Sequence, residues 1–363
     1  MRMLIAAAAG VLCASIAASA QDAPAPAPTY PEFEARVHKD PDGKTLPYRL
    51  LVPKGYDAAK PWPLVVWLHG SGERGANNRL QLANFVAEAF LSDSARLQFP
   101  CFVMAPQCSL TSGWMSANVN RVGPVSDSTR MTVATVLELC KEFKIDDRRI
   151  YISGFSAGAY GTWEMLARYP RLFAAAVPMA GCPDGRDKLV PRFKNTPIWA
   201  FHGDKDGNAP IAPARRMAAL IKEAGGDCRW TEFAGVGHVC TTQAFSQPGF
   251  FEWLFAQKRA TPSSAEPVTI PEDAVPVIKT LPIGTHGTWT GAVSRTSHGA
   301  PRLAIDDVRY RLVRAEGLDD EAAALLRQIG QGKATGRCEV TGTVMLDESD
   351  RPCITVEAVR KTE

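Results

Sequence analysis

Short runs of consecutive apolar residues recur along the first two thirds of the chain, without the polar alternation of a strand that faces water. These runs are PLVVWLHG (63–70), CFVMAP (101–106), IYISGF (150–155), AAAVPMAG (174–181) and PIWAFHG (197–203). Unbroken runs of this length are typical of parallel strands that are buried on both faces. CRWTEFAG at 228–235 follows as the expected last strand of the same sheet.

Stretches with helical spacing separate these runs, at 79–92, 129–144, 158–169 and 212–225, and FFEWLFAQK (250–258) follows the last strand. Strands that alternate with helices in this way predict βαβ units and a mostly parallel sheet with helices on its faces. Before the first apolar run, residues 36–51 suggest an edge hairpin with TLPYRLLVP as its second strand. The pattern therefore predicts an α/β domain.

The pattern changes after Arg259. Residues 260–276 are rich in Pro, Ser and Thr and predict a linker. Beyond it we expect strands at 287–294, 301–306 and 308–314, a helix at 321–329, and strands at 336–345 and 351–360. Three strands, a helix and two strands is the element order of a small OB-type barrel with five strands.

The first twenty residues have a composition of their own. Arg2 precedes eighteen uncharged, Ala-rich residues that end in Ala-Ser-Ala, which predicts a secretory signal cleaved before Gln21. Eighteen residues could just span a bilayer as an uncleaved anchor, but alanine is weakly apolar. Cys13 follows Leu12 rather than a small residue, unlike a lipoprotein signal. We therefore predict a periplasmic or secreted protein, without stable membrane insertion after cleavage.

These changes of composition predict five segments. They are a signal peptide (1–20), an Ala/Pro linker (21–32), an α/β domain (33–259), a second linker (260–279) and a small β-rich domain (280–363). The content of 45% hydrophobic and 22% charged residues is that of an ordinary globular protein. A net charge of only +3 does not suggest a nucleic-acid partner.

The pentapeptide Gly154-Phe155-Ser156-Ala157-Gly158 lies between a predicted strand and a predicted helix and matches G-x-S-x-G. In a nucleophile elbow, the strand turns sharply into the helix and exposes the serine hydroxyl on a strained corner. The alternative is an ordinary strand–turn–helix junction, so the rest of the chain has to distinguish the two.

A serine nucleophile needs a histidine to take its proton and a carboxylate to orient that histidine. In α/β-hydrolases the three arrive in the chain order Ser, Asp, His. HGDKD (202–206) ends a buried strand, and GVGH (235–238) follows the last strand, so both reach the edge to which the elbow points. His238 is therefore the predicted base, and Asp204 or Asp206 the acid. His69 and His202 lie at buried strand ends, where a structural role is expected.

The reaction of a serine hydrolase also needs two N–H donors for the oxyanion. We expect one from the backbone of Ala157, directly after the nucleophile. The second is expected from Ser71 in LHGSGERG (68–75), where Gly70 and Gly72 would let the backbone approach a substrate. The alternative for this segment is a simple glycine-rich turn.

Residues 47–259 resemble the esterase and "predicted peptidase" branch of the α/β-hydrolase superfamily, with polyhydroxybutyrate depolymerases and feruloyl or acetyl-xylan esterases among its members. The motifs that carry the resemblance are LHGSGERG (68–75), MAPQC (104–108) with Trp114, IDDRRIYISGFSAGAYGTW (145–163), RLFAAAVPMAGC (171–182), FHGDKD (201–206) and GVGH (235–238). The resemblance implies that Asp206, in H-G-x-x-D, is the acid. Gly207-Asn208-Ala209-Pro210 departs from the more apolar run that relatives have there.

The motifs and the resemblance together predict a serine carboxylic ester hydrolase that works through an acyl-enzyme. Such an enzyme requires neither a metal nor an organic cofactor. Because no large lid or propeller is evident, we expect esters of small acids or of polysaccharides as substrates. A serine peptidase of the same fold and a non-catalytic ligand-binding protein are the alternatives.

Eight cysteines follow the predicted signal, and no two have the C-x-x-C spacing of zinc ribbons or thioredoxin-like motifs. Cys182 follows the strand after the elbow, and Cys240 lies two residues beyond His238. Both are therefore expected at the same edge of the sheet, and we predict a disulfide between them.

Cys338 and Cys353 are predicted not to be joined. A hairpin of 336–345 and 351–360 would put Cys353 opposite Met345, with Cys338 seven residues further back. At about 3.3 Å per residue, Cys338 would be more than about 20 Å away, whereas a disulfide needs Cα atoms within about 7 Å. Strand alternation would also point one thiol into the barrel and the other away from it.

Overall fold

The computed structural model describes residues 29–115, 125–183, 187–266, 284–295, 301–305, 308–346 and 352–362. The predicted signal peptide and most of the second linker lie outside these residues. The described chain forms two sheets, one of eight strands and one of five.

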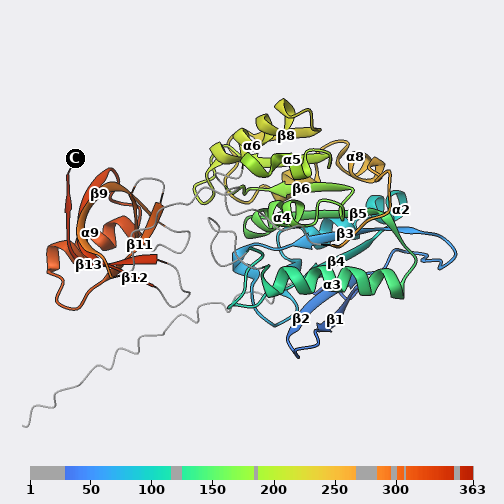
Figure 1. The fold of residues 1–363 in the computed structure, drawn as a ribbon, viewed down its shortest axis with the longest axis horizontal. Coiled ribbons are helices and arrows are strands. Elements are labelled where there is room, and N and C mark those ends of the chain that lie inside the picture. Colours follow the sequence, from blue (N-terminus) through green and yellow to red (C-terminus); the bar gives the residue numbers. More distant parts are fainter. Residues whose placement is uncertain are drawn as a thin grey trace, which may run out of the picture.

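The larger sheet has the order β1-β2-β4-β3-β5-β6-β7-β8 (Figure 1). Its strands are β1 (Phe33–Lys39), β2 (Thr45–Leu51), β3 (Trp62–Leu68), β4 (Phe102–Pro106), β5 (Ile145–Phe155), β6 (Ala175–Met179), β7 (Ile198–Gly203) and β8 (Cys228–Phe233). β1 and β2 form the expected edge hairpin, and β2 pairs with β4 in the antiparallel sense. Every neighbouring pair from β4 across to β8 is parallel. The polar side chains that follow these strands therefore gather at one edge of the sheet.

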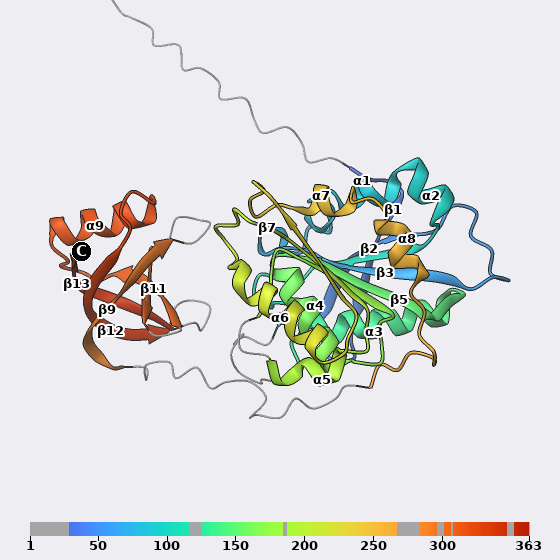
Figure 2. The same ribbon diagram turned by 90° about the horizontal axis from the view of Figure 1, so that it is seen from above.

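Helices cover both faces of this sheet (Figure 2). They are η1 (Ser71–Glu73), η2 (Leu80–Leu82), α1 (Val86–Leu91), α2 (Asp93–Gln98), α3 (Asp127–Glu142), α4 (Ala157–Arg168), η3 (Asp187–Leu189), α5 (Val190–Phe193), α6 (Ile211–Glu223), α7 (Thr241–Phe245) and α8 (Phe250–Ala256). Residues 79–92 were expected to form one helix, which is wrong. Asn84 and Phe85 have φ of 62° and 66°, and two successive left-handed residues cannot continue a right-handed helix.

The sheet separates two hydrophobic cores. Successive side chains of β3 point alternately into one core and the other. Leu64 and Val66 belong to the core that α3, α4 and α6 cover, and Val65 and Trp67 to the core that α1, α7 and α8 cover. Strands that are buried on both faces need apolar residues at every position, which explains the unbroken apolar runs of the sequence.

The predicted disulfide between Cys182 and Cys240 is wrong. Both residues are buried, and no disulfide joins them. Cys182 belongs to the core of α3, α4 and α6, and Cys240 to the core of α1, α7 and α8. The two thiols reach the same edge of the sheet, but from opposite faces.

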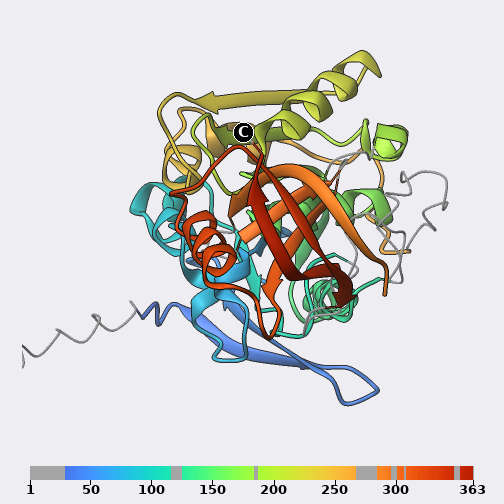
Figure 3. The ribbon, with the colours of Figure 1, turned by 90° about the vertical axis from the view of Figure 1, so that its left-hand side faces the viewer.

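The second sheet consists of β9 (His286–Arg295), β10 (Pro301–Ile305), β11 (Val308–Arg314), β12 (Arg337–Leu346) and β13 (Pro352–Lys361). They follow one another in the order β10-β11-β13-β12-β9, and the pairing of β9 with β10 closes the ring (Figure 3, orange to red). Only β11 and β13 pair in parallel; the other neighbours are antiparallel. The helix α9 (Asp320–Gly330) lies between β11 and β12 in the chain, and Ala322, Leu326 and Ile329 pack into the core.

The expected register of the last two strands is confirmed. Met345 lies opposite Cys353, and Cys338 lies opposite Lys361 at the other end of the pair. No disulfide joins Cys338 to Cys353, as predicted. Both side chains are buried, and Cys338 packs in the core of this sheet.

Within the described residues, no helix combines the length and the apolar composition that crossing a membrane would require.

Candidate active site

Ser156 occupies a sharp corner between two elements. β5 ends at Phe155, α4 begins at Ala157, and Ser156 between them has φ of 53° and ψ of −114°. A residue other than glycine is rare in this region and costs of the order of 1–3 kcal/mol. The N–H of Ser156 donates to the carbonyl oxygen of Met179 in β6, 2.9 Å away. The expected elbow is therefore present, and the neighbouring strand holds its backbone.

The two glycines of the pentapeptide are required by close backbone contacts. A Cβ on Gly154 would lie 2.3 Å from the carbonyl oxygen of Gly158. A Cβ on Gly158 would in turn lie 1.8 Å from the carbonyl oxygen of Leu68, at the end of β3. Only glycine lets α4 begin this close to the ends of β3 and β5.

The structure brings Ser156, His238 and Asp206 together from three separate segments. His238 Nε2 lies 2.8 Å from Ser156 Oγ, and His238 Nδ1 lies 2.8 Å from Asp206 Oδ2. A carboxylate can only accept, so Nδ1 carries a proton and donates it to Asp206. Nε2 is then the atom that accepts from the serine hydroxyl. This arrangement can withdraw the proton of Ser156 when its oxygen attacks an electrophile.

The carboxylate of Asp206 is fully buried and held by four donors. Its Oδ1 accepts from the N–H groups of Asn208 and Ala209, at 2.8 and 2.9 Å. Its Oδ2 lies near His202 Nε2, at 3.0 Å, as well as near His238. Burial raises the pKa of Asp206, but the hydrogen bonds from His202, His238, Ala209 and Asn208 outweigh it and hold the pKa well below its ordinary value. Asp206 is therefore ionised at neutral pH.

The segment after Asp206, which departs from the pattern of relatives, contributes to this site. Asn208 and Ala209 turn their backbone N–H groups back onto the carboxylate. Any residue except proline at positions 208 and 209 can make these two hydrogen bonds, because they come from the backbone. The departure in sequence therefore leaves the acid held in place.

Asp204 has a different position from Asp206. Its Oδ1 accepts from the N–H of Gly235 at 2.7 Å, and its Oδ2 lies 3.7 Å from Lys205 Nζ. Asp204 thus fastens the loop that leads to His238. Of the two acids of HGDKD, it is Asp206 that contacts the histidine.

The two predicted oxyanion donors lie at adjoining strand ends. Ser71 begins η1 shortly after β3, and Ala157 is the first residue of α4. Leu68 and Gly154, which precede them, are paired in the sheet. The first N–H groups of a helix have no partner within it, so they are available to an anion.

Gln107 anchors the loop that carries Ser71, and the sequence analysis missed it. This fully buried side chain donates to the carbonyl oxygen of Glu73 and to Asn77 Oδ1, both at 2.9 Å, and accepts from the N–H of Asn78 at 2.7 Å. The loop and Gln107 are about thirty residues apart, so local spacing gave no sign of their contact. The signals in the sequence were its place in the MAPQC motif and its position at the end of an apolar strand.

His69 holds the same loop from its other end. Its Nε2 accepts from the N–H of Cys108 at 3.1 Å, and its carbonyl oxygen accepts from Trp114 Nε1 at 2.8 Å. Burial lowers the pKa of His69 to about 4, so the ring is neutral at physiological pH. These contacts agree with the structural role expected for His69.

The loop that carries Ser71 also contains a carboxyl group, that of Glu73. A Cβ on Gly70 would be 2.8 Å from Glu73 Oε2, an oxygen that is buried and has no hydrogen-bond partner among the described residues. Burial raises the pKa of Glu73 above its ordinary value. Glu73 is thus a titratable group near the predicted catalytic centre that the motifs did not single out.

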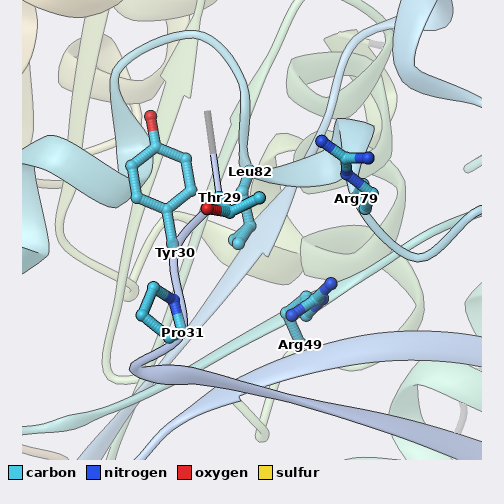
Figure 4. A pocket seen from close by; sticks show the side chains of 6 residues that line it. All are labelled: Thr29, Tyr30, Pro31, Arg49, Arg79 and Leu82. Carbon is cyan, nitrogen blue, oxygen red and sulfur yellow. The ribbon is translucent and has the colours of Figure 1, made fainter. Parts of the chain in front are cut away.

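A cavity of about 180 Å³ lies beside the edge hairpin of β1 and β2 (Figure 4). Thr29, Tyr30, Pro31, Arg49, Arg79 and Leu82 line it. The guanidinium of Arg49 donates to the carbonyl oxygens of Asn78 and Phe33, at 2.5 and 2.9 Å. Arg49 therefore ties the end of the Ser71 loop to β1, and we assign the cavity no catalytic part.

Among the described residues, no group of three or more His, Cys, Asp and Glu side chains is arranged to hold a metal ion.

Comparisons with known proteins match the α/β portion of the chain. A family model described as phospholipase/carboxylesterase matches residues 56–247. A probable carboxylesterase of Oryza sativa subsp. japonica is 23% identical over 218 residues, which are 55% of this chain and 90% of that protein. A probable carboxylesterase of Arabidopsis thaliana is 21% identical over 219 residues, 55% of this chain and 81% of that protein.

Among solved structures, one described as a thermostable esterase is 38% identical, with a TM-score of 0.60. The match covers 63% of this chain and 64% of that chain. It therefore leaves more than a third of each protein outside the comparison.

Proposed function

The chain belongs to the phospholipase/carboxylesterase family, and we propose that it is a serine hydrolase that cleaves carboxylic esters. The α/β-hydrolase fold and the esterase relationship expected from the motifs are correct. The observation that carries the proposal is the pair of 2.8 Å contacts that link Ser156 to His238 and His238 to Asp206.

In the proposed reaction, Ser156 Oγ attacks the ester carbonyl carbon while His238 Nε2 takes the hydroxyl proton. The resulting imidazolium is stabilised by the ionised Asp206, and it then protonates the departing alcohol. Water enters, gives a proton to His238 and attacks the acyl-enzyme, which releases the acid and restores Ser156. The short contacts and the buried carboxylate support these roles.

We assign the oxyanion to the backbone N–H groups of Ala157 and Ser71. Negative charge develops on the carbonyl oxygen in the tetrahedral intermediate, and preorganised donors stabilise it without having to reorient. The support is the position of both residues, which follow paired strand ends. The anchoring of the Ser71 loop by Gln107 and His69 would preorganise the second donor.

For the substrate we propose an ester of a small acid or an ester carried by a polysaccharide. Serine peptidases use the same groups on amides, so a peptidase is the nearest alternative, and an inert binding protein is the next. The family match and the esterase relatives favour esters.

The test is hydrolysis of p-nitrophenyl acetate together with labelling by a fluorophosphonate probe. We expect both with the wild-type protein. A panel of feruloyl, acetyl-xylan, short-chain aryl and peptide substrates would then rank the acyl groups and separate esterase from peptidase. A folded protein that neither turns over an ester nor takes the probe would support the binding-protein alternative.

For the rest of the chain we propose an OB-type barrel in 280–363 and export through residues 1–20. Strand order, the parallel β11–β13 pair and the position of α9 between β11 and β12 support the barrel type. Export stays a prediction from the Ala-rich segment, and N-terminal sequencing of the protein from a periplasmic fraction would test it.

A further inference from the structure

Asp206 contacts two imidazole rings. His202 is the fifth residue of β7, its side chain is buried, and its Nε2 lies 3.0 Å from Asp206 Oδ2. This is the same oxygen that lies 2.8 Å from His238 Nδ1. The first residue of the H-G-x-x-D motif thus contacts the last one. His202 was expected to have a purely structural role, but it lies against the acid of the predicted triad.

The partners of His202 show which ring nitrogen carries the proton. Nε2 is near two acceptors, Asp206 Oδ2 at 3.0 Å and the carbonyl oxygen of Ala209 at 3.2 Å. An unprotonated nitrogen would repel both, so Nε2 carries a proton and donates. Nδ1 is buried and has no hydrogen-bond partner among the described residues. A proton there would lose its hydration without compensation, so the ring has its single proton on Nε2.

With this donor, each oxygen of Asp206 accepts two hydrogen bonds. The backbone N–H groups of Asn208 and Ala209 occupy Oδ1, and the two histidines occupy Oδ2. A carboxylate has about four acceptor positions, so none is left to water. Rotation of the carboxylate would break bonds on both oxygens at once.

We infer that His202 is a positioning residue that fixes the carboxylate of Asp206 in the orientation His238 requires. The inference rests on the proposed function, because it assigns His202 to the reaction through Asp206 rather than through contact with the substrate. When His238 becomes an imidazolium, the Nδ1–H bond to Oδ2 has to keep its direction, and a misplacement of about 1 Å can cost about a hundredfold in rate. The hydrogen bond from His202 Nε2 to Oδ2 prevents that displacement.

The test compares two substitutions with opposite hydrogen-bonding capacity. His202→Phe keeps a ring of similar size but has no donor, whereas the amide nitrogen of His202→Gln reaches about as far as Nε2. For His202→Phe we expect kcat on p-nitrophenyl acetate to fall about tenfold to a hundredfold, with KM changed less than about threefold. His202→Gln should recover most of that loss.

A second readout does not depend on turnover. We expect a strongly downfield proton NMR resonance from the proton between His238 Nδ1 and Asp206 Oδ2. It should move or broaden in His202→Phe and stay near its wild-type position in His202→Gln. If the wild type hydrolyses no ester, the proposed function fails, but this resonance still tests the positioning role.

His38→Phe is the matched control. His38 is also buried, also contacts a carboxylate (Glu138, 2.8 Å), and also has a buried ring nitrogen without a partner among the described residues. It lies on β1, at the opposite end of the sheet from β7. Its loss should lower stability without changing kcat or the resonance.

Two results would overturn the inference. One is a folded His202→Phe protein with wild-type kcat and an unchanged resonance. If His202→Phe does not fold, His202→Asn takes its place, because the shorter amide of asparagine does not reach Oδ2. The inference is then overturned if His202→Asn equals His202→Gln in kcat and in the resonance.

Discussion

The carbonyl oxygen of Leu68 lies 1.8 Å from the position that a Cβ on Gly158 would occupy. The backbone at the start of α4 therefore contacts the backbone at the end of β3 directly, with no side chain between them. For Gly158→Ala we expect the free energy of unfolding to fall by more than about 3 kcal/mol, because neither backbone can move without disturbing the elbow. Urea unfolding measures the change.

Gly207→Ala is the control for this substitution. A Cβ on Gly207 would meet nothing within 4 Å, so this variant should unfold within about 0.5 kcal/mol of the wild type. Equal stability of the two variants would contradict the packing described for the elbow.

Replacing Ser156 by alanine should abolish ester turnover and probe labelling while the fold survives. Alanine is smaller than serine and leaves the Met179 backbone bond in place. Loss of one member of such a triad lowers kcat by roughly 10⁴–10⁶-fold. The measurements are kcat and circular dichroism, and more than a few per cent of residual activity would refute the assignment of the nucleophile.

The two aspartates of HGDKD should differ sharply in their effect on activity. Asp206→Asn replaces an ionised acceptor of His238 Nδ1–H, so the imidazolium loses its stabilisation and kcat should fall by about 10³-fold or more. Asp204→Asn keeps an oxygen that can accept from Gly235 N–H, and kcat should stay within a few-fold of wild type. Similar losses in both, or the reverse order, would show that the acid is misassigned.

Glu73→Gln should stabilise the protein at neutral pH. Burial raises the pKa of Glu73 from its ordinary value of 4.5, so the folded state holds a proton that the unfolded state has already released. The wild type therefore loses stability as the pH rises from about 4.5 through the raised pKa, and the loss is complete above it. Glutamine does not titrate and should avoid this loss.

Unfolding free energies of the wild type and Glu73→Gln between pH 3.5 and 8 would test this prediction. The advantage of the variant should vanish below the ordinary carboxyl pKa of about 4.5. A difference that stays constant with pH would mean that the effect does not come from ionisation of Glu73.

The melting temperature should not depend on reductant. Cys182 and Cys240 lie in cores on opposite faces of the sheet, and burial raises the pKa of the Cys240 thiol to about 12. Alkylating reagents should therefore modify these two residues only after denaturation. A cross-linked peptide containing both in a non-reducing digest would contradict the separation of the two cores.

Local patterns in the sequence were enough for much of the fold and for the candidate triad. Runs buried on both faces predicted the strands of the larger sheet, because the hydrophobic effect needs apolar residues at each such position. The G-x-S-x-G pentapeptide predicted the elbow at Ser156, because the turn from strand to helix and the close approach of Gly154 to Gly158 both lie within the pentapeptide. The choice of Asp206 needed the family resemblance, since the residues alone left Asp204 open.

Contacts between distant segments were decided only by the tertiary structure. Strand ends predicted that Cys182 and Cys240 share an edge, but the face from which each side chain arrives follows from helix packing, and it separates them. Gln107 holds the Ser71 loop across about thirty residues. His202 and Asp206 are close in sequence, but their contact depends on how the chain turns back after β7. Periodicity reports which residues are buried, whereas these contacts depend on which buried residues meet, and that is set by the pairing and packing of the whole sheet.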